Sequence, residues 1–310
     1  MTLVKRQLSG LVLALALMLA VVPAAGASYP GSNGLLSFVI AEEDSPGFVG
    51  LYVDQPFANT PATQILGCNS SAAPCPAGDI ASFSPGGSTI AFGTDDGNVG
   101  LIAPDGSNAR ELSIPGLFSI SNPVWSPHAA DWVLEGFSNS DPGGDVYAAP
   151  TTPIVGPGGG SVRQLTVRHG GDPDWSFKDR IAFEEGLNPN APINPDNQLF
   201  AINPDGSGRQ QLTRRGGADP SWSPHGAYMA FSRNNQIYTM KVPSSGSGQK
   251  ATRLTGKGGS NPIWSPDGKW IAFERGNGVY VMTTKAKRLR RVAVAGDGYF
   301  FSELGWQPLP

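Results

Sequence analysis

The sequence predicts an all-β protein, a six-bladed β-propeller built from four-stranded antiparallel blades. The main observation is that an aromatic residue precedes a Ser-Pro, Ser-Phe or Gln-Pro turn six times, at spacings of 42, 50, 47, 42 and 42 residues. These aromatics are Phe83, Trp125, Trp175, Trp222, Trp264 and Trp306. A period near 40 residues that holds four short strands is typical of a propeller blade. The 41 Gly and 28 Pro are spread through the chain, which indicates many tight turns between short strands.

The most regular repeat lies between residues 260 and 294. Asn261–Trp264 reads as a first strand, and the turn Ser265–Gly268 leads to a second strand, Lys269–Glu274. A Gly-Asn-Gly turn precedes the third strand, Val279–Met282, and a charged fourth strand follows at 285–294. Comparable blades start near Asp79, Asn122, Asp172, Asp219 and Asn261. The repeated aromatics are expected to anchor the blades by packing between them.

The two ends of the chain carry complementary parts of one blade. Trp306 has no room after it for three more strands, whereas the stretch 34–66 offers three strands without an aromatic opener. We therefore expect the segment 304–310 to supply the inner strand of a blade completed by 34–66. This pairing closes the ring and removes open sheet edges.

The N-terminus has the pattern of a secretory signal peptide. Lys5 and Arg6 precede an apolar run at 11–22, and Ala25-Gly26-Ala27 supplies small residues for cleavage. Cleavage after Ala27 leaves a single domain, residues 28–310, in a secreted or periplasmic protein without a transmembrane span. An uncleaved N-terminal anchor is the alternative.

Charge and cysteine content fit an exported domain. The mature part has 20 basic and 25 acidic residues, a balance of −5, which argues against a nucleic-acid partner. The two cysteines, Cys68 and Cys75, are expected to form a disulfide in an oxidising compartment.

The repeats resemble the TolB-type propeller, whose pattern is D-P-x-W-S-P-D-G followed by I-A-F, I-Y-x-M and L-T. The best matches are Asp172–Thr213, Asp219–Met240 and Asn261–Met282. The resemblance implies a TolB-like six-bladed propeller of the WD40-like repeat class. Because the first predicted strand begins soon after the predicted cleavage site, we expect no counterpart of the α/β domain that precedes the propeller in TolB. The sequence contains no G-x-S-x-G elbow of the kind found in propeller-gated hydrolases.

Polar residues recur three positions before the aromatics, and we call these the mouth positions. They are Asn122, Asp172, Asp219, Asn261 and Glu303, with Asp79 one residue out of register before Phe83. Strand alternation places the mouth positions at one end of the central channel. The loops between second and third strands share that face and carry Glu42, Glu43, Asp44, Asp95, Asp96, Asp141, Asp145, Glu184, Glu185 and Asp196, opposed by Arg233 and Arg275.

Two interpretations of this acidic face stay open. It can concentrate a cation or a basic segment of a partner, with Ca²⁺ at Asp172 and Asp219 as a candidate. Alternatively, Asp or Asn before Pro simply orders a turn. The basic run at 285–291 likewise indicates either an anionic partner, such as a cell-surface polymer, or a charged outer strand that resists edge pairing. His128, His169 and His225 lie in different blades, which argues against a shared metal.

The predicted function is a monomeric, non-catalytic binding module that contacts another envelope or secreted protein through the acidic channel face. The competing class is an enzyme similar to propeller lactonases and lyases, with a divalent metal at the channel mouth.

Overall fold

The computed structural model describes residues 29–42, 48–68, 74–76, 81–151, 161–186, 197–244 and 250–310, without the side chains of Phe48, Asp141, Pro142 and Glu303. The predicted signal peptide, residues 1–27, lies outside these ranges. Within them the chain forms strands and turns and no helix, so no helix there is long and apolar enough to span a membrane.

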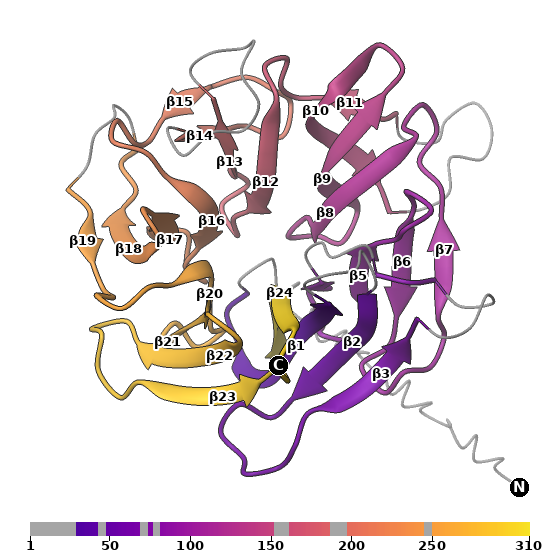
Figure 1. Ribbon diagram of the computed structural model, residues 1–310. Coiled ribbons are helices and arrows are strands. Elements are labelled where there is room, and N and C mark those ends of the chain that lie inside the picture. Colours follow the sequence, from indigo (N-terminus) through magenta and orange to yellow (C-terminus); the bar gives the residue numbers. More distant parts are fainter. Residues whose placement is uncertain are drawn as a thin grey trace, which may run out of the picture.

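The strands form six four-stranded antiparallel sheets around a central axis (Figure 1). Blade one contains β24 (Tyr299–Leu309), β1 (Ser32–Glu42), β2 (Phe48–Asp54) and β3 (Thr63–Gly67). Blade two contains β4 (Ser82–Phe83), β5 (Ile90–Gly93), β6 (Val99–Ile102) and β7 (Arg110–Leu112). Blade three contains β8 (Ser119–Trp125), β9 (Asp131–Ser138), β10 (Asp141–Pro150) and β11 (Arg163–Gln164).

The other three blades follow in chain order. Blade four contains β12 (Gly170–Trp175), β13 (Ile181–Glu185), β14 (Gln198–Ile202) and β15 (Gln210–Gln211). Blade five contains β16 (Ala218–Trp222), β17 (Tyr228–Arg233), β18 (Gln236–Lys241) and β19 (Thr252–Arg253). Blade six contains β20 (Ser260–Trp264), β21 (Trp270–Arg275), β22 (Gly278–Thr283) and β23 (Arg290–Val294). The predicted six-bladed all-β propeller is confirmed.

The ring closes through antiparallel pairing of β24 with β1. The register places Trp306 opposite Leu36 and Ser302 opposite Val39. The closing strand begins at Tyr299, five residues earlier than predicted, because it follows β1 along its length. The side chain of Gln307 ties it to blade two, since its Nε2 donates to the carbonyl of Gly87 at 2.8 Å.

The repeated aromatics fill the interfaces between blades. All six are buried, with exposed fractions of 2 to 7%. Trp264 illustrates the packing, because it lies with Ile271 of its own blade against Ala230 and Ile237 of blade five. Each blade therefore depends on its neighbours for its core.

The predicted pairing of Cys68 with Cys75 is present as a disulfide, with Cα atoms 5.0 Å apart. It joins the end of β3 to the segment before β4. The same segment adds a bridge between Pro76 and Thr94, so the disulfide fixes this connection against blade two.

Several acidic residues expected in loops are in strands instead. Glu184 and Glu185 end β13, where they pair with Leu199 and Gln198 of β14. Asp145 lies in β10, opposite Gly136 of β9. The interpretation of these residues as loop residues was wrong because the second and third strands continue pairing beyond the apolar core.

Candidate functional site

Backbone conformation explains the residue types at four mouth positions. Asn122, Asp172, Asp219 and Asn261 have φ values of 52°, 44°, 49° and 47°. Each lies at a register shift between the inner strand of its blade and the second strand. Asn and Asp tolerate this left-handed region better than most side chains do. The repeated Asn or Asp before Pro therefore has a structural role whatever else it does.

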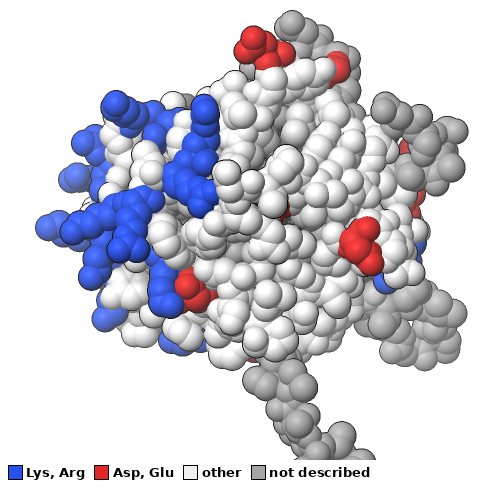
Figure 2. Space-filling view, turned by 90° about the horizontal axis from the view of Figure 1, so that it is seen from below, with Lys and Arg blue, Asp and Glu red and all other residues white. Residues whose placement is uncertain are grey.

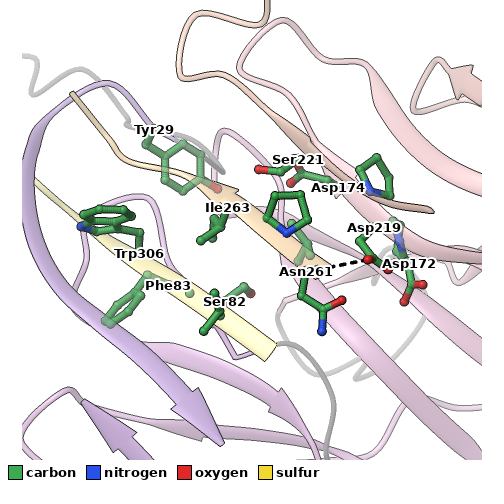
Figure 3. A pocket seen from close by; sticks show the side chains of 16 residues that line it. Tyr29, Ser82, Phe83, Asp172, Asp174, Asp219, Ser221, Asn261, Ile263 and Trp306 are labelled. Atoms are coloured by element: carbon green, nitrogen blue, oxygen red, sulfur yellow. Dashed lines mark hydrogen bonds between the residues drawn. The ribbon is translucent and has the colours of Figure 1, made fainter. Parts of the chain in front are cut away.

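Three of these positions line the channel together with the residues two places further on, whereas blade three contributes Val124 and not Asn122. Asp172 and Asp174 both reach the cavity on the axis, as do Asp219 with Ser221 and Asn261 with Ile263 (Figure 3). A second layer is formed by the residue directly before each of the six aromatics, namely Ser82, Val124, Asp174, Ser221, Ile263 and Gly305. The cavity between them has a volume of about 90 Å³.

Three carboxylates converge at the mouth, from blades four and five. One oxygen each of Asp172, Glu184 and Asp219 lies within 4.8 Å of the other two. We call these three residues the mouth triad. Glu184 is buried, whereas Asp172 and Asp219 are partly exposed. The mouth triad contains two of the predicted site residues and adds Glu184.

Hydrogen bonds connect the mouth triad to the flanking blades. The Nδ2 group of Asn122 donates to Oδ1 of Asp172 at 2.6 Å. The backbone N–H of Asn261 donates to Oδ2 of Asp219 at 3.1 Å (Figure 3). Asn197 donates to Oε1 of Glu184 at 2.9 Å. The other oxygen of Glu184, Oε2, is buried and has no hydrogen-bond partner within the described part of the chain. The mouth triad therefore keeps acceptor capacity that these contacts do not use.

Burial raises the pKa values of carboxyl groups at the site. Burial first, and then the neighbouring charge of Asp219, raise the pKa of Glu184 to about 7. Burial also raises the pKa of Asp219. In blade three, burial raises the pKa of Glu135 to about 7, although Ser121 and the backbone of Asp172 donate to its carboxylate. Desolvation disfavours each anion, and within the described residues no positive group offsets the shifts of Glu135, Glu184 and Asp219.

Glu135 and Glu274 occupy the place of Glu184 in their own blades and were missed by the sequence reasoning. All three follow the apolar core of the second strand, in the stretches Val-Leu-Glu, Ala-Phe-Glu and Ala-Phe-Glu. Oε2 of Glu274 accepts a hydrogen bond from Nδ2 of Asn261 at 3.1 Å. The repetition of Glu after this apolar stretch was the signal that could have identified them.

Tyr29 lies at the opposite end of the channel. Its hydroxyl is 3.2 Å from the carbonyl oxygens of both Trp125 and Ser126, and its side chain is buried. Nearby, Asp174 accepts a hydrogen bond at 2.6 Å from the backbone N–H of Trp222, and burial raises the pKa of Asp174 to about 7. Tyr29 had no sequence signal, because its place depends on the path of the N-terminal segment across the ring.

The remaining predicted residues do not join the mouth triad. Asp79 lies outside the described residues, as do Glu43, Asp44 and Asp196. Glu303 lies in β24, and only its backbone is described. The expected opposing cations, Arg233 and Arg275, are held away from the carboxylates. Their Nε groups donate to the carbonyls of Gly216 and Gly258, and both guanidinium groups stack on aromatic rings of their own blades.

Comparison with known proteins identifies solved structures that share this fold. No protein-family model matches the chain, and no curated protein matches it. TolB from Acinetobacter baumannii is similar in structure, with a TM-score of 0.66 and 15% identity over 89% of this chain and 67% of that one. A chain of the nidogen/laminin complex has a TM-score of 0.66 and 9% identity, covering 88% of this chain and 98% of its own.

A third similar structure is regucalcin, a calcium-binding protein from Agrobacterium tumefaciens. Its TM-score is 0.51, with 13% identity over 71% of this chain and 75% of that one. Identities this low establish the fold and nothing further. The chain thus has the fold of a TolB-like six-bladed β-propeller.

Proposed function

We propose that the protein is a non-catalytic binding module that receives a positively charged side chain of a partner protein at the mouth of its channel. The observation that carries the proposal is the mouth triad, in which one carboxylate oxygen from each of three residues lies within 4.8 Å of the other two. Charge of one sign in a recess attracts groups of the opposite sign.

The raised pKa of Glu184 favours binding of a cation at the mouth. Glu184 holds its proton up to about pH 7 because its anion is buried and is repelled by Asp219. A lysine or arginine head placed among the carboxylates would reduce the repulsion and supply donors to the unpartnered Oε2 of Glu184. Binding of the partner's positive charge would thus displace the proton that Glu184 otherwise retains.

The size of the cavity favours recognition over catalysis. At about 90 Å³ it admits an ion, a few waters or the end of one side chain. Pockets that enclose an organic substrate are typically several times larger, on the order of 300–1,000 Å³. A partner therefore contacts the face around the mouth and inserts only a small group.

The cellular setting of this proposal is outside the cytoplasm. The predicted signal peptide supports export, and the predicted partner is a secreted or envelope protein. The nidogen/laminin structure provides an example of a similarly folded chain within a protein complex.

The test uses hexalysine as the probe, titrated into the mature protein in chelator-containing buffer. The variant D172N/E184Q/D219N removes the charges of the mouth triad. A matched control, D105N/E111Q/D205N, changes the net charge equally at three exposed positions away from the mouth. We expect the mouth variant to bind hexalysine about tenfold or more weakly than the parent, and the control to bind as the parent does. Equal weakening in both variants would contradict the proposal.

A divalent cation is the second candidate, favoured by the composition of the mouth triad. Three carboxylates supply the oxygen ligands that Ca²⁺ prefers, and Ca–O distances of about 2.3–2.6 Å are compatible with oxygens within 4.8 Å of one another. A metal here would support the alternative of a metal-assisted propeller enzyme. Elemental analysis of the purified protein distinguishes the two, because a tightly held ion at one per chain favours the enzyme and its absence favours the binding module.

A further inference from the structure

The basic residues of the mature chain are concentrated in two blades. Residues 209–291, which include blades five and six, contain 15 of the 20 basic residues and 3 of the 25 acidic ones, a balance of 15 − 3 = +12. The rest of the mature chain contains 5 basic and 22 acidic residues, a balance of 5 − 22 = −17. The low net charge of the whole chain therefore hides a strong separation of charge.

Few acidic groups offset this basic region. Two of its three acids, Asp219 and Glu274, lie at the channel mouth, and the third, Asp267, pairs with Lys269 at 3.4 Å. The exposed lysines and arginines between Lys241 and Arg291 form what we call the basic rim. Figure 2 shows Lys and Arg side chains gathered along one edge of the molecule, at several heights, with little acidic surface between them.

Protection of outer strands does not account for the basic rim. The outer strands β7 and β11 each contain one arginine, and β3 and β15 contain no basic residue. Most cations of the rim lie outside the outer strands, for example Lys257, Lys269 and Lys285. A charge there guards no open sheet edge.

We propose that the basic rim binds a flexible, linear acidic polysaccharide. Blades five and six occupy an arc of the ring, so a flexible chain can follow the basic rim around it (Figure 1). A DNA duplex has a persistence length of about 50 nm, so it is too stiff to follow the edge of one domain and would contact only a small part of the rim. A lipid surface is flat, so it would also contact only a small part of the rim. The predicted export of the protein also places it where cell-surface polymers occur.

The test uses carboxymethyl-dextran as the probe and uncharged dextran as its matched control. The variant R253E/K285E/K287E reverses three exposed charges of the rim. A control variant, R110E/R163E/K178E, reverses three exposed charges in blades two to four. Binding is followed by fluorescence titration at several salt concentrations, and folding of each variant is checked by circular dichroism.

We expect the parent to bind carboxymethyl-dextran and not dextran, with an affinity that falls as salt increases. The rim variant should bind about tenfold or more weakly, and the control variant should bind within about twofold of the parent. Absence of binding to carboxymethyl-dextran would overturn the proposal. Equal losses in the two variants, or binding only to duplex DNA or to phosphatidylglycerol vesicles, would overturn it as well.

Discussion

Replacement of Glu184 by glutamine isolates the free-energy cost of a buried charge at the channel mouth. Glutamine has nearly the same shape as protonated glutamate, and its carbonyl oxygen can accept the hydrogen bond that Asn197 donates. The pKa of Glu184 is about 7 in the folded protein, against 4.5 for an ordinary glutamate. The folded state therefore binds more protons than the unfolded state between these values, and the contribution of Glu184 to stability falls as pH rises through them.

The raised pKa of Glu184 sets an upper limit on the change in the free energy of unfolding. The pKa of Glu184 lies about 2.5 above that of an ordinary glutamate, which at about 1.4 kcal/mol per pKa unit corresponds to at most about 3–4 kcal/mol above pH 7. Part of it belongs to repulsion by Asp219 and is shared between the two groups. We therefore expect E184Q to be about 1–3 kcal/mol more stable than the parent at pH 8, and within about 0.5 kcal/mol of it at pH 5.

Urea unfolding at pH 5, 6, 7 and 8, in chelator-containing buffer, measures this difference. E111Q is the matched control, since it makes the same substitution at a glutamate that is exposed on an outer strand. If E184Q is instead less stable than the parent at pH 8, the carboxylate stabilises the mouth and the reasoning fails.

Three further perturbations test the ring, the channel and the disulfide. Deletion of Leu304–Pro310 removes most of the closing strand, so we expect loss of cooperative thermal unfolding; a truncated protein that melts like the parent would refute ring closure. Y29F removes the hydroxyl bonded near the end of the channel and should lower the free energy of unfolding by about 1 kcal/mol, as measured with urea; no change would show that this contact contributes nothing. Reduction of Cys68–Cys75, which are separated by 7 residues, should lower stability by about 2 kcal/mol in a thermal scan with and without reductant, whereas equal melting temperatures would mean that the loop is already ordered.

The repeat made most of the fold predictable from sequence. Each aromatic before its turn fixes the inner strand of a blade, and the unmatched Trp306 at the C-terminus indicated how the ring closes. The ends of the strands were less predictable, because the hydrogen bonding of β24 and β13 continues into residues whose polarity suggests loops. Local polarity is a weak guide where a sheet edge reaches the solvent.

The candidate site was only partly accessible to the same reasoning. The alternation of successive connections between the two faces of the propeller placed Asp172 and Asp219 at the channel mouth, and the structure brings them together with Glu184. Glu184 was assigned to the correct face but to a loop, so its burial could not be anticipated. The contacts of Tyr29 arise from packing between segments about 96 residues apart, which no local pattern encodes.

The most direct test of the central claim is to count the protons released when the mouth binds a cation. Calorimetric titration of hexalysine at pH 7, in buffers with different ionisation enthalpies, gives this number. Since the pKa of Glu184 is about 7, binding at the mouth should release up to about half a proton per chain, and E184Q should release markedly less. Binding without proton release, or equal release from the parent and E184Q, would show that the cation binds elsewhere.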